Sequence, residues 1–318
     1  MKPKIIVIAG PTASGKTALS IELAKRIGGE IISCDSMQIY KDMDIGTAKV
    51  TQDEMQGIKH YLIDFVSPDE RYSVSNFKTD CENAIEQILK KNKVPIIVGG
   101  TGLYVDSIIY GIEYQDMQFD EKYRQDLMKI AETEEGLAKL YDEASKIDKE
   151  AIAKISPNDK KRIIRILEIY KATGKNKTEQ EKMSRQKELK YEFVVFALDM
   201  EREKLYERIN RRVDLMIKKG LIHEVENLKE KYNHFPTAMQ GLGYKEVVEY
   251  LEGKCSYKEM IEKIKQETRH YAKRQLTWFR KNKQTRWLNA EEKIQNNIDV
   301  ILKFIWERIK IWITKKIS

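Results

Sequence analysis

The segment Gly10–Thr17 (GPTASGKT) constrains the fold more than any other part of the sequence. It fits the pattern G-x-x-x-x-G-K-[ST], which needs a buried strand before it and a helix after it. Both are predicted, because Ile5–Ala9 is a short apolar run and Ala18–Ile27 has apolar residues at helical spacing. The alternative is a glycine turn with only a structural role. We predict a phosphate-binding loop (P-loop) made of Gly10, Pro11, Thr12, Ala13, Ser14, Gly15, Lys16 and Thr17.

The first part of the chain alternates strands with helices. Glu30–Ser33 and Val94–Val98 are short apolar runs, and Val74–Lys91 between them has helical spacing. Such alternation predicts a mostly parallel sheet with right-handed crossovers. The expected fold class is therefore α/β, with a P-loop NTPase-like parallel sheet flanked by helices.

Two further parts follow in the sequence. From Asp120 to Lys190 charged residues dominate, with helical spacing and no convincing strand, and one helix there is predicted to be capped by Pro157–Asp159 and to end at Gly174. Tyr191–Leu198 again has the character of a strand. We therefore predict a helical insertion domain at 114–190, placed between the two parts of a P-loop core at 1–113 and 191–318. The second core part is expected to be helical nearly to its end.

Positive charge is concentrated near the C-terminus. The chain of 318 residues has a net charge of +8, and the segment Lys263–Arg286 alone holds nine basic residues and one acidic residue. An acidic partner such as RNA would suit this segment. Within it Trp278 and Phe279 lie among basic residues, an arrangement that suits phosphates and unpaired bases. Alternatively, the aromatic side chains belong to the core and the charges form a solvated helix face.

Three cysteines, Cys34, Cys81 and Cys255, are far apart in the sequence. An odd number without paired spacing predicts neither a zinc site nor a disulfide framework. The apolar run at the N-terminus is too short for a signal peptide, and charged residues interrupt the apolar run 298–313. We expect a cytoplasmic protein with no membrane association.

A carboxylate for the site is predicted after the second strand. The third strand ends in VGGTGLY (98–104) without an acidic residue, whereas Asp35 directly follows the second strand. The carboxyl ends of parallel strands share one crevice, so Asp35, Thr17 and Thr101 should converge there. The alternatives are a turn or helix-cap role for Asp35 and a tight strand exit for Gly99–Gly102.

Six blocks of sequence resemble the tRNA dimethylallyltransferase family. That family has a P-loop core with a small helical insertion domain. The resemblance implies magnesium as cofactor, with Thr17 as its protein ligand, and it implies dimethylallyl diphosphate and the anticodon stem-loop of tRNA as partners. We expect a monomer. The blocks, in chain order, are GPTASGKT (10–17), DSMQIYKDMDIGTAK (35–49), VGGTGLY (98–104), PNDKKR (157–162), GLGYK (241–245) and KRQLTWFR (273–280).

The family chemistry gives these residues roles. The amides of the P-loop, Lys16 and magnesium would stabilise the departing diphosphate. Asp35 would accept a proton from the adenine N6 amine, a poor nucleophile, while Thr101 positions the reacting groups. Arg208 and Arg212, one helical turn apart, resemble diphosphate-side arginines, although an exposed basic face is the alternative.

The resemblance also implies contacts with tRNA, from which the target adenosine must be flipped out. Rival functions are prenylation of free adenine nucleotides, a P-loop kinase, and a non-catalytic RNA-binding ATPase. Arg124 is included in the tRNA set for its position alone. The set comprises Asp35, Ser36, Met37, Gln38, Thr101, Arg124, Asp159, Lys160, Lys161, Arg162, Gln240, Gly241, Leu242, Gly243, Tyr244, Lys245, Lys273, Arg274, Gln275, Trp278, Phe279 and Arg280.

Overall fold

The computed structural model describes residues 2–112, 120–185 and 188–317. The chain divides into two compact units, one formed by Met1–Val105 with Lys190–Ser318 and the other by Asp106–Leu189. The boundary expected at 113–114 lies outside the described residues. Across the described ranges, no helix combines the length and the apolar character needed to cross a membrane.

The first unit is built on a sheet of six strands in the order β3-β2-β4-β1-β5-β6, with every pair parallel. This confirms the predicted parallel α/β sheet. In the strand β1, Ile6 pairs with Ile96 of β4 on one side and with Val194 of β5 on the other. The strands are β1 (Lys4–Ala9), β2 (Gly29–Ser33), β3 (His60–Tyr61), β4 (Val94–Gly99), β5 (Glu192–Asp199) and β6 (Arg286–Asn289).

The two edge strands differ from the prediction. The C-terminal part was expected to be helical nearly to its end, but β6 interrupts it, and β3 was not predicted at all. β3 has two residues, and only Leu288 of the four in β6 is buried. Neither segment has the apolar run or the alternation that marks a strand in sequence. Their backbone conformation comes from pairing with β2 and β5.

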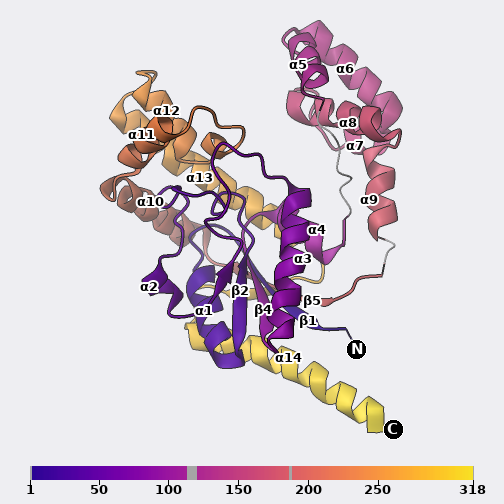
Figure 1. The fold of residues 1–318 in the computed structure, drawn as a ribbon, viewed down its shortest axis with the longest axis vertical. Coiled ribbons are helices and arrows are strands. Elements are labelled where there is room, and N and C mark those ends of the chain that lie inside the picture. Colours follow the sequence, from indigo (N-terminus) through magenta and orange to yellow (C-terminus); the bar gives the residue numbers. More distant parts are fainter. Residues whose placement is uncertain (1, 113–119, 186–187, 318) are drawn as a thin grey trace. The chain divides into compact units, whose positions relative to one another are not determined.

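Most helices of this unit flank the sheet or cover the carboxyl ends of its strands (Figure 1). The helix α1 begins directly after the P-loop and ends at Gly28, whose φ of 64° is the left-handed conformation typical of a helix C-terminus. The last helix, α14, packs on α1 through Ile298 and Ile301. The helices are α1 (Lys16–Ile27), α2 (Gln52–Met55), α3 (Val74–Lys90), α10 (Arg202–Lys218), α11 (Leu221–Lys231), η1 (Ala238–Gln240), α12 (Tyr244–Leu251), α13 (Tyr257–Arg280) and α14 (Ile294–Ile317), while α4 (Gly102–Ile109) runs across the boundary between the units.

A second hydrophobic cluster joins α10–α13 to the segment that follows β2. It contains Ile39, Tyr40 and Met43 from that segment, together with Tyr244 and Met260 from the helices. Each of these side chains is at most 1% exposed. The cluster therefore fixes the helical C-terminal part over the strand ends, where Asp35 lies.

The second unit is helical throughout its described part. Its core contains Leu127, Leu140, Ile163 and Leu167. The helix α8 begins where the sequence predicts, because the Asp159 carboxylate accepts the Arg162 N–H at 3.1 Å, and it ends at Gly174, as predicted. The helices are α5 (Glu121–Ile130), α6 (Glu134–Ile147), α7 (Lys149–Ile152), α8 (Lys160–Thr173) and α9 (Lys177–Arg185).

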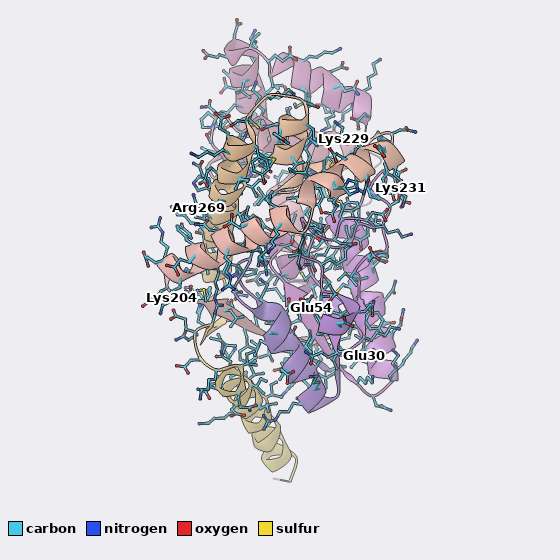
Figure 2. The ribbon with its side chains drawn as sticks, turned by 90° about the vertical axis from the view of Figure 1, so that its left-hand side faces the viewer. Glu30, Glu54, Lys204, Lys229, Lys231 and Arg269 are labelled. Carbon is cyan, nitrogen blue, oxygen red and sulfur yellow. The ribbon has the colours of Figure 1, made fainter. Side chains whose placement is uncertain are left out.

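A buried carboxylate in β2, Glu30 (Figure 2), makes stability depend on pH. Glu30 is 3% exposed, its side chain lies 3.0 Å from Lys91 Nζ and 2.8 Å from Lys93 Nζ, and it accepts the Tyr61 hydroxyl at 2.8 Å. Burial alone would raise the pKa of Glu30. The hydrogen bonds from Lys93, Tyr61 and Lys91 outweigh burial and lower the pKa from 4.5 to about 2.

We expect Glu30→Gln to reduce the free energy of unfolding at pH 7 by about 2 kcal/mol, allowing for the partly exposed lysines. Since folding depresses the pKa, this stabilisation is complete above the unfolded-state value of 4.5 and is lost as the pH falls toward 2. Urea denaturation of both proteins between pH 2 and pH 7 measures the difference. A difference that does not change with pH would show that these ion pairs do not stabilise the fold.

Candidate functional site

Two glycines of the predicted P-loop have backbone conformations that other residues rarely adopt. Gly10 and Gly15 have φ values of 140° and 94°, which favour glycine, and a Cβ at Gly10 would lie 3.0 Å from the Leu198 carbonyl oxygen. The Lys16 ammonium donates to the Pro11 carbonyl at 2.6 Å, so it folds back along the loop. The buried Ser14 hydroxyl has no hydrogen-bond partner among the described residues. An unpaired buried donor in this loop fits a ligand with acceptor oxygens.

A cavity of about 610 Å³ lies at the carboxyl ends of β1, β2 and β4. This is the size of a small-molecule site. The structure brings Thr17 and Asp35 into its wall, whereas Thr101, predicted to converge with them, is not among the lining residues. Predicted site residues that line it are Thr12, Ala13, Ser14, Gly15, Lys16, Thr17, Asp35, Ser36, Met37, Gln38, Arg212, Gln240, Gly241, Leu242, Gly243, Tyr244, Lys245, Arg274 and Gln275.

Two cations face reduced solvation in this cavity. Burial, and after it the charge of Arg212 nearby, lower the pKa of Lys16 to about 7, while Asp35 acts in the opposite direction. Burial also lowers the pKa of Arg212, whose guanidinium donates to the Thr12 hydroxyl at 3.2 Å. Desolvated cations beside a P-loop would be stabilised by a multiply charged anion. Arg208, in contrast, is exposed and does not line the cavity.

The Asp35 carboxylate has a role in the local fold. Its Oδ1 accepts the N–H groups of Met37 at 2.9 Å and Gln38 at 3.3 Å, which is the turn role considered as the alternative. An ionised carboxylate has further acceptor capacity at Oδ2. The Thr101 hydroxyl accepts the Ser36 N–H at 3.1 Å, so it holds the loop that carries Asp35.

Close packing explains why glycines follow β4. A Cβ at Gly99 would lie 2.0 Å from the Cys34 carbonyl oxygen, so the exits of β2 and β4 pass in close contact. A Cβ at Gly102 would lie 2.4 Å from the Trp278 ring of α13. The tight strand exit considered for this segment is therefore observed, and it brings Thr101 beside the Asp35 loop.

Gln275 joins the P-loop to the loop after β4. Its side-chain oxygen accepts the Thr12 N–H at 2.8 Å, and its side-chain nitrogen donates to the Gly100 carbonyl at 2.9 Å. The residue is only 5% exposed. Although the family resemblance implies that Gln275 contacts tRNA, both ends of its amide are engaged within the protein.

The basic segment of α13 divides into inward and outward residues. Phe279 is 2% exposed, which supports the core interpretation for that ring. Arg280 is exposed but pairs with Asp199 at 2.9 Å, whereas Lys273 and Arg274 are exposed and the Arg274 guanidinium lies 5.8 Å from the Tyr271 ring centroid. Of these exposed charges, that of Arg274 belongs to a residue that lines the cavity.

Tyr271 is a site residue that the sequence reasoning missed. It lines the cavity, and its hydroxyl hydrogen-bonds with the side chains of Thr101 and Gln275. Burial, and after it the charge of Asp35, raise the pKa of Tyr271, so the phenol stays protonated. Its position four residues before Gln275, on one helix face, is the sequence signal that would have found it.

The predicted tRNA residues of the second unit lie on α5 and α8. Arg124 forms an ion pair with Glu168 at 3.0 Å, a contact within this unit. Arg162 is exposed and lies 3.3 Å from Asp159, the residue that caps α8. Lys161 beside it is exposed, and Lys160 is partly exposed.

The chain matches a protein-family model described as IPP transferase over residues 38–282. A tRNA dimethylallyltransferase of Acetivibrio thermocellus is 51% identical over 289 residues, which cover 91% of this chain and 92% of that protein. The crystal structure of a full-length tRNA isopentenylpyrophosphate transferase from Bacillus halodurans has a TM-score of 0.74 and 41% identity, with 100% of both chains covered. A eukaryotic dimethylallyltransferase acting on tRNA has a TM-score of 0.78 and 34% identity, with 96% of this chain and 80% of that chain covered.

Proposed function

The chain belongs to the IPP transferase family, and on that basis we propose that it transfers the dimethylallyl group of dimethylallyl diphosphate to tRNA. The acceptor is the N6 amine of the adenosine 3′ to the anticodon, in tRNAs that read codons beginning with U. The products are N6-(dimethylallyl)adenosine and diphosphate. The observation that carries this proposal is the shared cavity, which has a P-loop in one wall and the Asp35 carboxylate in another.

The P-loop side of the cavity suits the diphosphate. The allylic carbon tolerates positive charge, so the barrier lies largely in the departure of diphosphate. Backbone N–H groups of the loop, the Lys16 ammonium and the Arg212 guanidinium, all from residues that line the cavity, would stabilise the charge that develops on the leaving oxygens. The Ser14 hydroxyl, which has no partner within the described part of the chain, adds a donor.

Magnesium is the cofactor we propose, with Thr17 as its protein ligand. The Thr17 hydroxyl lines the cavity at the start of α1, and the described residues contain no cluster of three or more acidic, histidine or cysteine ligands. Mg²⁺ often has few protein ligands and keeps substrate phosphates and water as the others, so this donor set fits. The ion would neutralise charge on the diphosphate.

The Asp35 side of the cavity suits the adenine. As the N6–carbon bond forms, the carbon–oxygen bond to diphosphate breaks, and Asp35 accepts the proton that leaves the amine. Thr101 keeps Asp35 in place through the Ser36 N–H. Because the base must enter a cavity, it leaves the RNA stack first.

Labelled dimethylallyl diphosphate tests the function directly. The protein is incubated with unmodified tRNA or with AMP, and we expect label in tRNA alone. Label in AMP would instead support a free-nucleotide prenyltransferase. ATP turnover stimulated by tRNA, without prenyl transfer, would support an RNA-binding ATPase.

The exposed charges of α13 are expected to bind tRNA phosphates. Replacing Lys273, Arg274 and Arg280 with Ala should weaken tRNA binding. It should also reduce the slope of log affinity against log salt concentration by at most the contribution of about three phosphate contacts, because each contact releases counterions. Part of the Arg280 charge is already balanced by Asp199. Binding of dimethylallyl diphosphate should not change, since that ligand belongs to the P-loop.

The measurement is tRNA binding at several salt concentrations, with folding checked by circular dichroism. Lys258→Ala, an exposed lysine near the start of the same helix, serves as the control. An unchanged slope in a folded triple variant would mean that these charges only solvate the helix. The search for the RNA site would then move to the second unit, beginning with Arg162.

A further inference from the structure

We propose that Glu224, on α11, is a positioning residue for the acceptor side of the cavity; this inference rests on the function proposed above. One carboxylate oxygen, Oε2, accepts the N–H groups of Asp44 at 2.9 Å and Ile45 at 2.7 Å. The other, Oε1, accepts the Gly46 N–H at 3.0 Å and the Tyr244 hydroxyl at 2.7 Å. A single side chain thus holds three successive backbone amides and a phenol.

The segment that Glu224 holds forms part of the cavity wall. Gly46, Thr47 and Ala48 line the cavity, and Ala48 has a φ of 50°, a conformation that non-glycine residues adopt at a cost. The Glu224 carboxylate accepts the N–H groups of Asp44, Ile45 and Gly46 but is not itself a lining residue, so it holds this segment from outside the cavity. A charged acceptor strengthens each of these hydrogen bonds.

The segment in turn holds Gln38, next to the proposed base. The Gln38 side-chain nitrogen donates to the carbonyls of Thr47 at 3.2 Å and Ala48 at 3.3 Å. The backbone N–H of the same residue donates to Asp35 Oδ1. A shift of residues 44–48 would therefore move the Gln38 side chain and disturb the turn around Asp35, without a direct contact between Glu224 and substrate.

Tyr244 connects Glu224 to a second part of the same wall. Tyr244 is 1% exposed, and its ring packs so closely that a Cβ at Gly46 would lie 2.5 Å from it. It belongs to the segment 240–245, all of which lines the cavity. Burial, together with the charge of Glu224, raises the pKa of Tyr244, so its hydroxyl remains a donor.

The end of α11 holds the same loop at another point. The Lys231 ammonium, labelled in Figure 2, lies 2.7 Å from Asp42 Oδ2, and the Tyr232 hydroxyl donates to the same oxygen at 2.6 Å. Asp42 also has a left-handed φ, of 61°. The loop is thus fastened to α11 at both ends of the helix, whereas Gln275 of α13 fastens the P-loop. The wall proposed to bind dimethylallyl diphosphate and the wall proposed to bind the adenosine are therefore held by different residues.

This separation gives Glu224→Gln a specific expected effect. Glutamine has one acceptor oxygen and one donor nitrogen in place of the two carboxylate oxygens. The N–H or O–H groups that now donate to one of these oxygens would therefore face the glutamine NH₂ group, which is itself a donor. We expect KM for tRNA to rise about tenfold or more, the loss expected for one charged hydrogen bond. The inhibition constant of inorganic diphosphate against dimethylallyl diphosphate should stay within about twofold of the parent value.

Two further variants complete the experiment. Glu226→Gln is the matched control, because Glu226 is an exposed glutamate of the same helix, and its Oε2 lies 3.5 Å from His223 Nδ1. It should behave as the parent. Tyr244→Phe removes one of the four hydrogen bonds and should raise KM for tRNA by a smaller factor than Glu224→Gln.

A parent-like KM for tRNA in folded Glu224→Gln would overturn the proposal. So would a variant in which the diphosphate inhibition constant and KM for tRNA change together with the melting temperature, because that pattern indicates a general loss of structure. Failure of the proposed function is separate, since it would appear as absence of label transfer to tRNA by the parent protein in the same assay.

Discussion

The variant Asp35→Asn is expected to lower turnover by about 100-fold or more while changing tRNA affinity little. Asparagine keeps a side-chain oxygen that can accept the N–H groups of Met37 and Gln38, so the turn is preserved. It has no basicity with which to take a proton from the adenine amine. Single-turnover prenylation of tRNA, with tRNA affinity measured by filter binding, gives the two quantities.

Two other variants show which role of Asp35 is lost. Asp35→Ala removes both the base and the turn acceptor, so a larger defect than in Asp35→Asn would measure the contribution of the turn. Asp53→Asn, at an exposed aspartate of α2, is the control and should have parent turnover. Near-normal turnover in Asp35→Asn would exclude Asp35 as the base.

The variant Lys16→Met is expected to lower turnover by about 100-fold, because it removes the cation that we propose stabilises the departing diphosphate, while keeping a side chain of similar length. Inorganic diphosphate should compete with dimethylallyl diphosphate in the parent, and both should bind more weakly to the variant. tRNA affinity should remain, since Lys16 belongs to the P-loop wall. Inhibition by diphosphate in steady-state assays measures the effect.

Lys25→Met is the matched control on the same helix. Lys25 is exposed and pairs with Glu22 at 2.8 Å, outside the cavity lining. The variant Lys25→Met should bind diphosphate as the parent protein does. If diphosphate inhibited Lys16→Met and the parent equally, the donor would have to bind elsewhere.

Local sequence patterns predicted the elements that local interactions determine. The strand–loop–helix around Lys16 follows from glycine positions and apolar spacing, and the limits of α8 follow from the cap at Asp159 and the glycine at Gly174. These features depend on neighbouring residues. The sheet order and the edge strand β6 depend instead on pairing with distant segments, and no local pattern specifies that pairing.

The same distinction applies to the site. Asp35 and the P-loop were predicted because each directly follows a strand. The role of Gln275 was not, because its contact with Thr12 joins residues 263 positions apart and its own surroundings in sequence are basic and aromatic. Glu224 lies in an ordinary amphipathic helix, so its contacts with Asp44–Gly46 become visible only when the chain is folded.

Within about one turn, the helix α13 carries exposed basic residues and residues that contact the loops of the site. Lys273 and Arg274 are exposed, while Tyr271 and Gln275 hydrogen-bond with the P-loop and with the loop after β4. Since successive residues are separated by about 100° around a helix axis, inserting or deleting one residue here would exchange these directions. The length of this helix before Gln275 is therefore as tightly constrained as the identity of the residues, and changes between natural variants should be substitutions rather than insertions or deletions.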